Sequence, residues 1–467
     1  MDARVHDPKA ERRLCRKLDF RILPLIAIMY LFNALDKGNI SNAKTDGIVE
    51  DLNMKEEQWN ILLSIFYIPF VLCALPLSLV IKKFTAAVVI PILMIGFGGL
   101  SLICAAVVNF GGLMAVRWFL GMCESAFFPG IIFYLSTFYR RAELARRLAI
   151  FYAAANIANA FSGVLSFGVF QINGSLHGWQ YLFLIEGAAT IVCAIIAFIY
   201  LPRTPATAWF LNQEEKDLAF HRIQTDATAV VGENVSVRDA MKVFGHPVTI
   251  AWLFISICVG VPLNSVNNWM PQIIESMGDL SPAMTNLYTV APNVFGAVCL
   301  LVFAFASDYF KRRAIFIFLS FVCSLIGFIV FGVISNDARA GKYVLAHVMC
   351  MGGSSSSVLL AAWYTNNIPG ESRRAVVAAV GVPLANAAGL ISTNIFLPQD
   401  APKYVTALGI TGGFGGAGAL TTLLVMLFMK FDNRKRNKSQ GVNWTYEDVS
   451  TADMADGPKN PNFRWFL

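Results

Sequence analysis

Charged side chains are scarce in this sequence. Only 14% of its 467 residues are Asp, Glu, Lys or Arg, whereas a soluble domain carries about 25%. Hydrophobic residues make up 56% of the chain. This composition excludes an ordinary soluble protein and indicates a chain that crosses a membrane many times. The net charge of +7 does not indicate nucleic-acid binding, because the basic residues cluster at the ends of apolar runs.

The nine cysteines are spread along the chain, and no two of them form a C-x-x-C motif. Isolated cysteines within apolar runs usually act as small apolar side chains, so we expect neither disulfides nor a metal site. The stretch 352–357 (GGSSSS) lacks the lysine of a phosphate-binding loop. No nucleophile–base pair or cofactor motif stands at the end of an apolar run. The sequence therefore predicts neither an enzyme nor a bound cofactor.

About twelve apolar segments are long enough to cross the ~30 Å hydrocarbon core of a bilayer as helices. The first nineteen residues are polar, so we expect no cleavable signal peptide and a first span that acts as a signal anchor. The predicted spans are 20–39, 59–81, 86–108, 112–138, 147–171, 179–201, 247–271, 284–306, 314–335, 342–364, 375–397 and 404–430.

Lysine and arginine gather in the first tail and after every second span. By the positive-inside rule this alternation places both termini in the cytoplasm, and an odd number of spans would break it. The long segment 202–246 carries both signs of charge and is predicted to be a cytoplasmic linker. The predicted domains are a tail (1–19), a six-helix half (20–201), this linker, a second six-helix half (247–430) and a polar, flexible tail (431–467).

The two halves repeat a pattern at an offset of about 228 residues. A serine four residues before a basic pair follows span two (Ser78) and span eight (Ser307). A glutamate shortly before two arginines follows span four (Glu143) and span ten (Glu371). Parallel six-helix repeats describe the major facilitator fold, whose substrate site lies near the membrane midplane between the halves. The sequence thus predicts an all-α membrane protein with about twelve transmembrane helices in two pseudo-symmetric halves.

Span four contains an arginine and a glutamate, Arg117 and Glu124, within its apolar run. Seven residues make about two helical turns, so both side chains leave one face, roughly 10 Å apart. A charge at this depth costs at least ~2.5 kcal/mol and is tolerated only toward a bundle interior or a wet cavity. We predict an anion anchor at Arg117 and a proton carrier at Glu124. The alternatives are that Arg117 snorkels to the surface, or that Glu124 forms a structural ion pair with Arg117 or Lys37.

Asp36 in span one is a third charged candidate. Adjacent residues on a helix diverge, so Asp36 and Lys37 are not expected to face one point, and Asp36 is predicted to face inward as a second protonatable group. The repeat offset makes Asn264 the equivalent of Asp36. Together with Asn267 and Asn268 it forms a polar patch in span seven, which predicts neutral, hydrogen-bonding recognition in the second half.

Several further polar residues lie within predicted spans. Such residues usually form hydrogen bonds between helices, and we expect that role here, with Asn156 also a substrate-binding candidate. The histidine among them is the one that could titrate near neutral pH, and the glutamate is interpreted as structural. These residues are Asn156, Asn159, Glu186, His347, Asn386 and Asn394.

Four stretches carry a resemblance to a known family: 35–43 (LDKGNISNA), 117–130 (RWFLGMCESAFFPG), 178–187 (GWQYLFLIEG), and 363–367 with 370–374 (WYTNN, GESRR). The chain resembles the anion:cation symporter branch of the major facilitator superfamily, and within it the fungal allantoate, nicotinate and vitamin permeases. The resemblance covers about 20–430, and it is most specific in the second and fourth stretches.

The resemblance implies import of a small organic anion, usually a carboxylate, with protons across the plasma membrane. It implies substrate anchoring by Arg117 and proton coupling by Glu124 and Asp36. Lys37, a further substrate-binding candidate, stands where the family has arginine, and lysine keeps the charge but loses the bidentate fork.

The resemblance also implies gating contacts at the cytoplasmic ends of the spans. After Lys83 the first-half loop lacks the glycine and two arginines of the family pattern, whereas the loop that begins at Ser307 keeps the equivalent feature. The candidate gating residues are Asp308, Arg312, Arg313, Glu143, Arg147, Glu371 and Arg374.

These residues suggest how transport is coupled. When a substrate carboxylate occupies Arg117, Glu124 loses its counter-charge and takes up a proton, so anion and proton bind together. This predicts a monomeric plasma-membrane symporter driven by the proton gradient, whose partners are an organic anion, a proton and the lipid bilayer, with no nucleic acid. One alternative is an exporter of a drug or secondary metabolite by proton antiport. Another is a transporter-like nutrient sensor, against which the short C-terminal tail argues.

Overall fold

The computed structural model describes residues 8–139, 141–172, 174–228, 241–278, 280–335, 338–368, 371–401, 403–449 and 457–467. Within these ranges the regular structure is helical and no strand occurs, which confirms the predicted all-α fold. Two compact units make up the chain. The first comprises Met1–Asn234 and Ser281–Leu287, and the second comprises Val235–Leu280 and Tyr288–Leu467.

Eleven helices in the described ranges are long and apolar enough to cross a membrane. The predicted span 147–171 falls on α7 (Arg141–Val169), whose described apolar stretch is Ile157–Val169. Helix α1 (Pro8–Thr45) starts well before the predicted residue 20. The apolar run marks only the part of a helix that fits the hydrocarbon core, so polar helical turns beyond it escape a hydropathy criterion.

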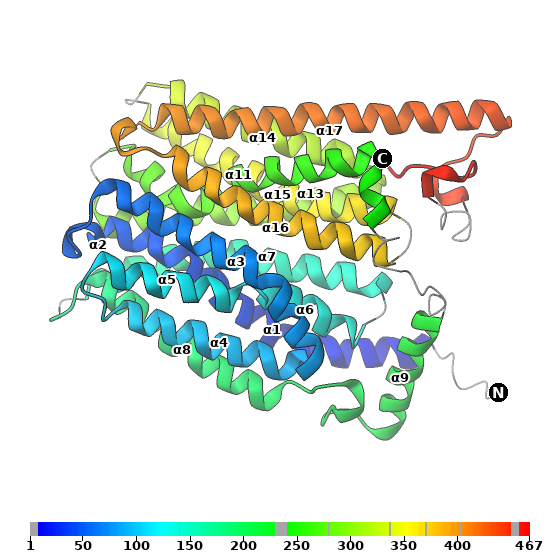
Figure 1. The fold of residues 1–467 in the computed structure, drawn as a ribbon, viewed down its shortest axis with the longest axis horizontal. Helices are drawn as coiled ribbons and strands as arrows, with labels where there is room; N and C mark the ends of the chain where they lie inside the picture. Colours follow the sequence, from blue (N-terminus) through cyan, green and yellow to red (C-terminus); the bar gives the residue numbers. More distant parts are fainter. Residues whose placement is uncertain are drawn as a thin grey trace. The chain divides into compact units, whose positions relative to one another are not determined.

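The first unit is a bundle of long helices with one short turn, α2 (Ile48–Asp51). Helix α4 packs along α8, α3 along α5 and α1 along α7. Gly121 permits the approach of α5 to α3, because a Cβ at this position would overlap the carbonyl oxygen of Phe66. Besides α1 and α7, the long helices are α3 (Glu56–Phe84), α4 (Ala86–Cys104), α5 (Phe110–Glu124), α6 (Phe127–Ser136) and α8 (Gly178–Tyr200) (Figure 1).

The predicted continuous span 112–138 is broken in the structure. Helix α5 ends at Glu124, α6 begins at Phe127, and Ser125 and Ala126 form a turn between them. Pro129 explains the break, because proline has no N–H to donate to the carbonyl four residues earlier, that of Ser125. The predicted span is confirmed, since Phe110–Ser136 is long and apolar enough to cross a membrane, but it contains this turn and Glu124 lies at a helix end.

The predicted linker 202–246 contains helices rather than an irregular chain. Helix α9 (Gln213–Thr228) lies against the first turns of α1. Lys17 contacts Glu215 with an N–O distance of 2.7 Å, and the buried Arg222 lies 3.9 Å from Glu11. Two short 3-10 helices, η2 (Pro205–Thr207) and η3 (Lys242–Gly245), also belong to this segment.

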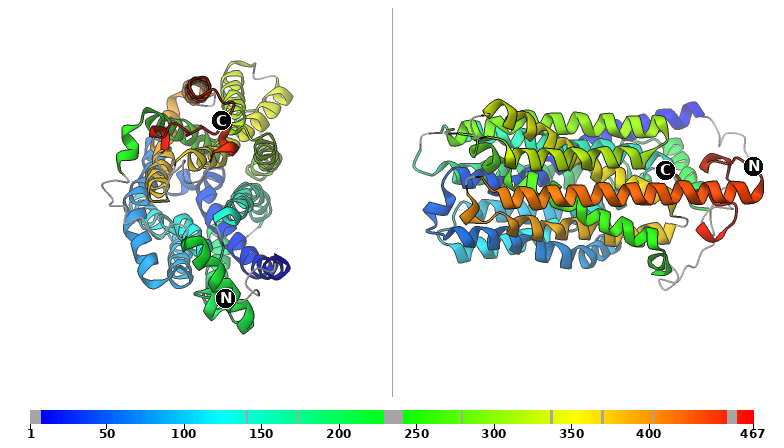
Figure 2. Two further views of the ribbon diagram at one scale, coloured as in Figure 1. Left: turned by 90° about the vertical axis from the view of Figure 1, so that its right-hand side faces the viewer. Right: turned by 90° about the horizontal axis from the view of Figure 1, so that it is seen from above.

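The second unit is a bundle in which α14 packs along both α15 and α17, and α11 packs along α16. Figure 2 shows α17 as the long orange helix of this unit. Gly260 on α11 faces the carbonyl of Ala385 on α16 at a distance that leaves no room for a Cβ. The helices of this unit are α11 (Pro247–Glu275), α13 (Val290–Phe310), α14 (Arg313–Val333), α15 (Arg339–Asn367), α16 (Glu371–Ile395) and α17 (Val405–Gln440). Helix α12 (Pro282–Tyr288) precedes α13 in the sequence, but up to Leu287 it belongs to the first unit.

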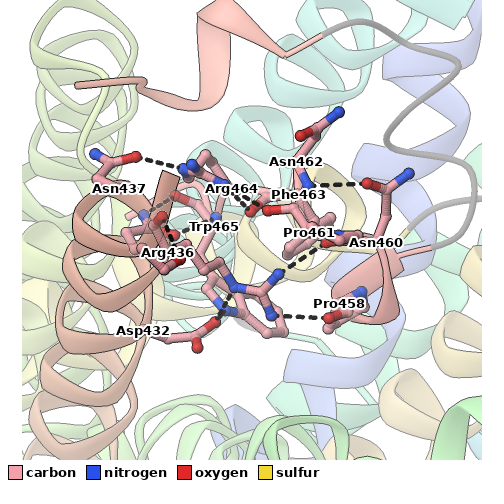
Figure 3. Close-up of polar contacts among 12 residues, drawn as sticks. Asp432, Arg436, Asn437, Pro458, Asn460, Pro461, Asn462, Phe463, Arg464 and Trp465 are labelled. Atoms are coloured by element: carbon pink, nitrogen blue, oxygen red, sulfur yellow. Dashed lines mark hydrogen bonds and ion pairs between the residues drawn. The ribbon is translucent and has the colours of Figure 1, made fainter. Parts of the chain in front are cut away.

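The C-terminal segment is not a flexible tail as predicted. Helix α17 continues to Gln440, and residues 457–467 fold back onto it. The Trp465 indole N–H donates to Asp432 at 2.8 Å, and the buried Arg464 donates to Asn437 at 2.7 Å (Figure 3). Phe463 and Trp465 join the hydrophobic core of the unit. Polar composition indicated flexibility, but the apolar and aromatic residues at the very end of the chain bury enough surface to hold the segment.

Candidate functional site

Polar residues recur at every third position of α1. Asn33, Asp36, Asn39 and Asn42 are all buried. Successive members are neighbours, but each step of three residues turns about 60° back around the helix, so the stripe winds around α1. The four residues accordingly reach α5, α4, α8 and α7 respectively. This stripe therefore connects α1 to four helices of the first unit. The spacing is visible in the sequence, although only Asp36 was selected from it.

Glu124 lies at the centre of this network and is 1% exposed. Its Oε2 accepts a hydrogen bond from the Asn33 side chain at 3.1 Å and lies 3.3 Å from the Lys37 ammonium. Its Oε1 is buried and has no hydrogen-bond partner among the described residues. One oxygen is thus stabilised by a positive charge and an amide, while the other is free to carry a proton.

Asp36 approaches the same carboxyl group. Its Oδ1 accepts a hydrogen bond from Ser101 at 2.7 Å, and its other oxygen is buried without a donor in the described part of the chain. The carboxyl groups of Asp36 and Glu124 lie close enough to interact electrostatically. Two ionised carboxylates in a buried site repel each other, and a proton on either one relieves that repulsion.

Lys37 also reaches Glu124, so the prediction that Asp36 and Lys37 cannot face one point was wrong. The Lys37 ammonium lies 4.7 Å from the centre of the Phe70 ring, and the side chain is 36% exposed. Neighbouring Cβ atoms do diverge on a helix, but the four-carbon stem of lysine is long enough to bring its charge back. The position next to Asp36 therefore provides the counter-charge of Glu124.

Glu186 on α8 is a third buried carboxyl group close to this network. It accepts a hydrogen bond from Asn39, and its other oxygen has no partner among the described side chains. It lies near enough to Asp36 for their charges to interact. A glutamate within an apolar run is visible in the sequence, but its link to α1 depends on how α8 packs, which the pattern does not reveal.

Arg117 differs from the other charges, because the described part of the structure gives it neither an ion pair nor a hydrogen bond. It is 4% exposed, and its Nε is buried without an acceptor. Its guanidinium lies over the Phe66 ring, 4.9 Å from the ring centre, which stabilises the cation without neutralising it. The alternative of a snorkelling arginine is not what the structure shows. A buried guanidinium in this state favours an anion.

The polar patch of span seven lies on α11 in the second unit. Asn264 donates to the carbonyls of Gly260 at 2.8 Å and Ala385 at 3.2 Å, so its amide supports the contact between α11 and α16. Asn268 is buried and Asn267 is exposed. The three residues thus lie on one helix, but the Asn264 amide also stabilises the packing of α11 on α16, besides any role in substrate recognition.

The remaining polar candidates make mostly local contacts. Asn386 and Asn394 donate to the carbonyls of Val382 at 2.9 Å and Leu390 at 2.8 Å, four residues earlier on the same helix, so these two bonds are local to α16. His347 Nδ1 lies 2.8 Å from a carbonyl of its own helix. Asn159 is partly buried in α7, and the structure does not describe the side chain of Asn156.

The structure describes the side chains of most candidate gating residues, but not of all of them. Arg313 donates to Asp308 at 2.9 Å, and Arg312 is exposed beside it. Arg147 binds Asp19 on α1 through two hydrogen bonds of 2.6 and 2.9 Å. Arg374 donates to the Ile368 carbonyl at 2.6 Å. The side chains of Glu143 and Glu371 lie outside the described ones.

The first-unit network is suited to binding an anion and a proton together. Among the described residues it offers one cation without an ion pair or hydrogen bond, a second that is shared with a carboxylate, and three buried carboxyl groups that each keep an oxygen without a donor. No group of three metal-ligating side chains occurs among the described residues.

Comparison with known proteins identifies relatives along most of the chain. The Major Facilitator Superfamily sequence model matches residues 26–393. An uncharacterized transporter of Schizosaccharomyces pombe is 58% identical over 465 residues, covering 99% of this chain and 92% of its own. The high-affinity nicotinic acid transporter of Saccharomyces cerevisiae is 28% identical over 458 residues, covering 97% and 85%. A D-xylose–proton symporter structure matches with a TM-score of 0.68 at 15% identity, over 86% of this chain and 97% of its own.

Proposed function

Because the chain belongs to the major facilitator superfamily, it is a multi-pass membrane transporter rather than an enzyme, and we propose that it imports a small organic anion together with a proton. The observation that carries this proposal is Arg117, a buried guanidinium that lacks an anionic partner in the described part of the first unit. An ionised substrate carboxylate would supply the missing charge through a bidentate contact.

Proton coupling would arise from the competition between substrate and protein carboxyl groups for cations. Lys37 holds Glu124 at 3.3 Å but remains partly exposed, so an arriving anion can draw the ammonium away. Glu124 would then be a buried carboxylate without a counter-charge, which is stable only when protonated. Asp36 would favour that proton, since its carboxyl group lies close enough to Glu124 for the two charges to repel. Anion binding and proton binding therefore favour each other, and linkage makes the effect reciprocal.

The substrate class is supported by one relative and by the resemblance in four sequence stretches. The yeast relative is a nicotinic acid transporter, and nicotinate is a small carboxylate of the kind that Arg117 would hold. We therefore propose the anion:cation symporter group, alternating access about a midplane site, a monomer in the plasma membrane and cytoplasmic termini. No cofactor is needed, since the proton gradient supplies the energy.

The test is transport by the purified protein in proteoliposomes with an imposed proton gradient. Labelled nicotinate and other small carboxylates should accumulate when the source compartment is acidic, and the accumulation should collapse when a protonophore is added. Uptake of neutral solutes alone would contradict the anion. Accumulation driven only by an opposed proton gradient would instead identify an antiporter, which is the exporter alternative. Binding without any flux would indicate a sensor.

A further inference from the structure

Two asparagine side chains of the second unit bind the backbone of adjacent residues in the C-terminal segment. The Asn433 amide of α17 accepts the Trp465 N–H at 2.8 Å and donates to the Trp465 carbonyl at 2.9 Å. The Asn367 amide at the end of α15 accepts the Phe466 N–H at 2.8 Å and donates to the Phe466 carbonyl at 2.9 Å. An amide side chain carries both a donor and an acceptor, so it can satisfy both backbone groups of one residue, as a neighbouring β-strand does. We call Asn367 and Asn433 the docking amides.

This pairing defines the path of the segment, in which residues 463–467 form neither a helix nor a turn. In an extended chain the N–H and C=O of one residue point to one side, and those of the next residue point to the other. The backbone groups of Trp465 face α17 and those of Phe466 face α15, so the segment lies between the two helices. Adjacent Cα atoms are only about 3.8 Å apart. The docked segment therefore holds the end of α15 close to α17.

Side chains at alternate positions anchor the segment. Phe463 and Trp465 are buried in the core of the unit, where the Trp465 ring lies 6.5 Å from that of Trp252. Arg464 lies between them in the sequence and donates instead to Asn437 on α17 at 2.7 Å (Figure 3). When a protein binds an extended peptide, backbone hydrogen bonds give affinity and pockets for alternate side chains give specificity. The contacts seen here therefore select a peptide with aromatic residues two positions apart.

The docking amides belong to the helices and not to the segment. Asn367 also donates to the Trp363 carbonyl of its own helix at 2.9 Å, which orients the amide independently of any peptide. A site that is oriented in advance lowers the entropic cost of binding. A departing segment would leave both amides with donors and acceptors that another extended peptide can satisfy.

We propose that the docking amides and the aromatic core beside them form a binding site for extended peptides with aromatic residues at alternate positions, and that residues 463–467 are its exchangeable ligand. While the segment is docked, it links α15 to α17. When it is released, this link is lost and the site accepts a peptide from another source. The site uses no residue of the first-unit network, so it is independent of the proposed symport.

The experiment measures binding of a fluorescein-labelled synthetic peptide with the sequence of residues 460–467 to the full-length purified protein. Fluorescence anisotropy in detergent gives the dissociation constant. The unaltered protein should bind the peptide weakly, because its own segment occupies the site. Trp465→Ala in the protein weakens this internal competitor and should tighten binding of the peptide by at least about tenfold. Phe466→Ala leaves both core aromatics in place and should shift the affinity in the same direction.

Changes in the site should have the opposite sign. Asn433→Ala, added to Trp465→Ala, removes both hydrogen bonds to one peptide residue and should weaken binding by about tenfold. Lys435→Ala in the same background alters an exposed residue of α17 and should leave binding unchanged.

A modified peptide separates docking from partition into detergent micelles. Methylation of the backbone nitrogen at the position of Trp465 removes the donor to Asn433 and makes the peptide more apolar. This peptide should bind at least about tenfold more weakly.

Two results would overturn the proposal. If neither Trp465→Ala nor Phe466→Ala tightens binding, the segment does not compete for the site. If the methylated peptide or Asn433→Ala leaves binding unchanged, the docking amides do not recognise the peptide backbone. Because the readout is peptide binding and not flux, failure here leaves the proposed symport intact, and loss of symport leaves this site intact.

Discussion

The ammonium of Lys37 lies 3.3 Å from Oε2 of Glu124, although Asp36 is the residue that helix geometry places on the inner face of α1. Glu124 is therefore paired with the first span rather than with Arg117, two turns away on its own helix. In the proposed mechanism this separates two roles: Arg117 would receive the substrate anion, while Lys37 would balance the charge of Glu124 until the substrate competes for it.

Replacing Glu124 by glutamine should abolish proton-driven accumulation but largely spare exchange of substrate down its own gradient. The amide keeps the size of the side chain and cannot carry the coupled proton. Counterflow and gradient-driven uptake in proteoliposomes measure the two processes. A Glu124→Gln protein that still concentrates substrate normally would remove Glu124 from the coupling mechanism.

Replacing Arg117 by alanine should raise the substrate concentration for half-maximal uptake by at least about thirtyfold, because the loss of a buried charge partner costs about 2–5 kcal/mol. Arg117→Lys should recover part of the affinity, since it keeps the charge but not the fork. The exposed Arg12 on the same unit provides the control, and Arg12→Ala should leave uptake unaffected. Unchanged affinity in Arg117→Ala would exclude this arginine from the site.

The pairing of Lys37 with Glu124 is open to a double-mutant cycle. Lys37→Gln should lower the unfolding temperature, because it leaves the buried carboxylate without its cation. Adding Glu124→Gln should restore most of that stability, because it removes the unpaired charge that destabilised the single variant. It should not restore accumulation. Additive losses in the double variant would show that the two side chains do not interact. Lys37→Arg should retain both stability and transport.

The contact between α9 and α1 should weaken at acid pH. Burial opposes ionisation of Glu215, but the hydrogen bonds from Lys17 and from the Asn212 backbone N–H, together with the Lys17 charge, outweigh it and hold the pKa of Glu215 below its usual value. The pair therefore stabilises above the ordinary carboxyl pKa of about 4.3, and this stabilisation is lost as the pH falls through the lower folded value. Both side chains are partly exposed, so the effect is about 0.5 kcal/mol.

Hydrogen exchange of α9 at pH 7 and below pH 4 measures this change. Glu215→Gln should show the faster exchange of α9 already at pH 7, with little further change on acidification. An identical pH response in the variant would assign the effect to other groups.

Trp465→Ala should destabilise the second unit by about 3–5 kcal/mol, because the side chain is 3% exposed and packs in the core. Trp465→Phe should cost less, since it keeps most of the apolar surface and loses the hydrogen bond to Asp432. Chemical denaturation in detergent ranks the variants. Equal stability of all three proteins would show that the C-terminal segment is not docked.

The sequence predicted the helices and the first-unit charges for one physical reason. Apolar runs mark membrane helices, and a charge inside such a run is expensive enough to be conspicuous, as at Arg117 and Glu124. The same reasoning selected Asp36. What it did not reveal is which charges meet, because Lys37 reaches Glu124 through the length of its side chain and Glu186 reaches Asn39 through the packing of α8 on α1.

The docked C-terminal segment was missed for a different reason. Residues 431–467 are polar on average, and average composition indicated flexibility. Its position is set by a few residues at the end, Phe463 and Trp465 in the core and Arg464 in a buried set of acceptors. Composition averages over such anchors, so only the structure reveals them.

The turn after Glu124 has a mechanical consequence. The carbonyl of Ser125 receives no hydrogen bond from Pro129, so the two-residue turn is where the fourth span can bend at little cost. Arg117 and Glu124 both belong to α5, the helix before this turn, and α6 is the helix after it. A rotation of α6 about this turn would therefore leave the spacing between Arg117 and Glu124, the proposed anion anchor and proton carrier, unchanged.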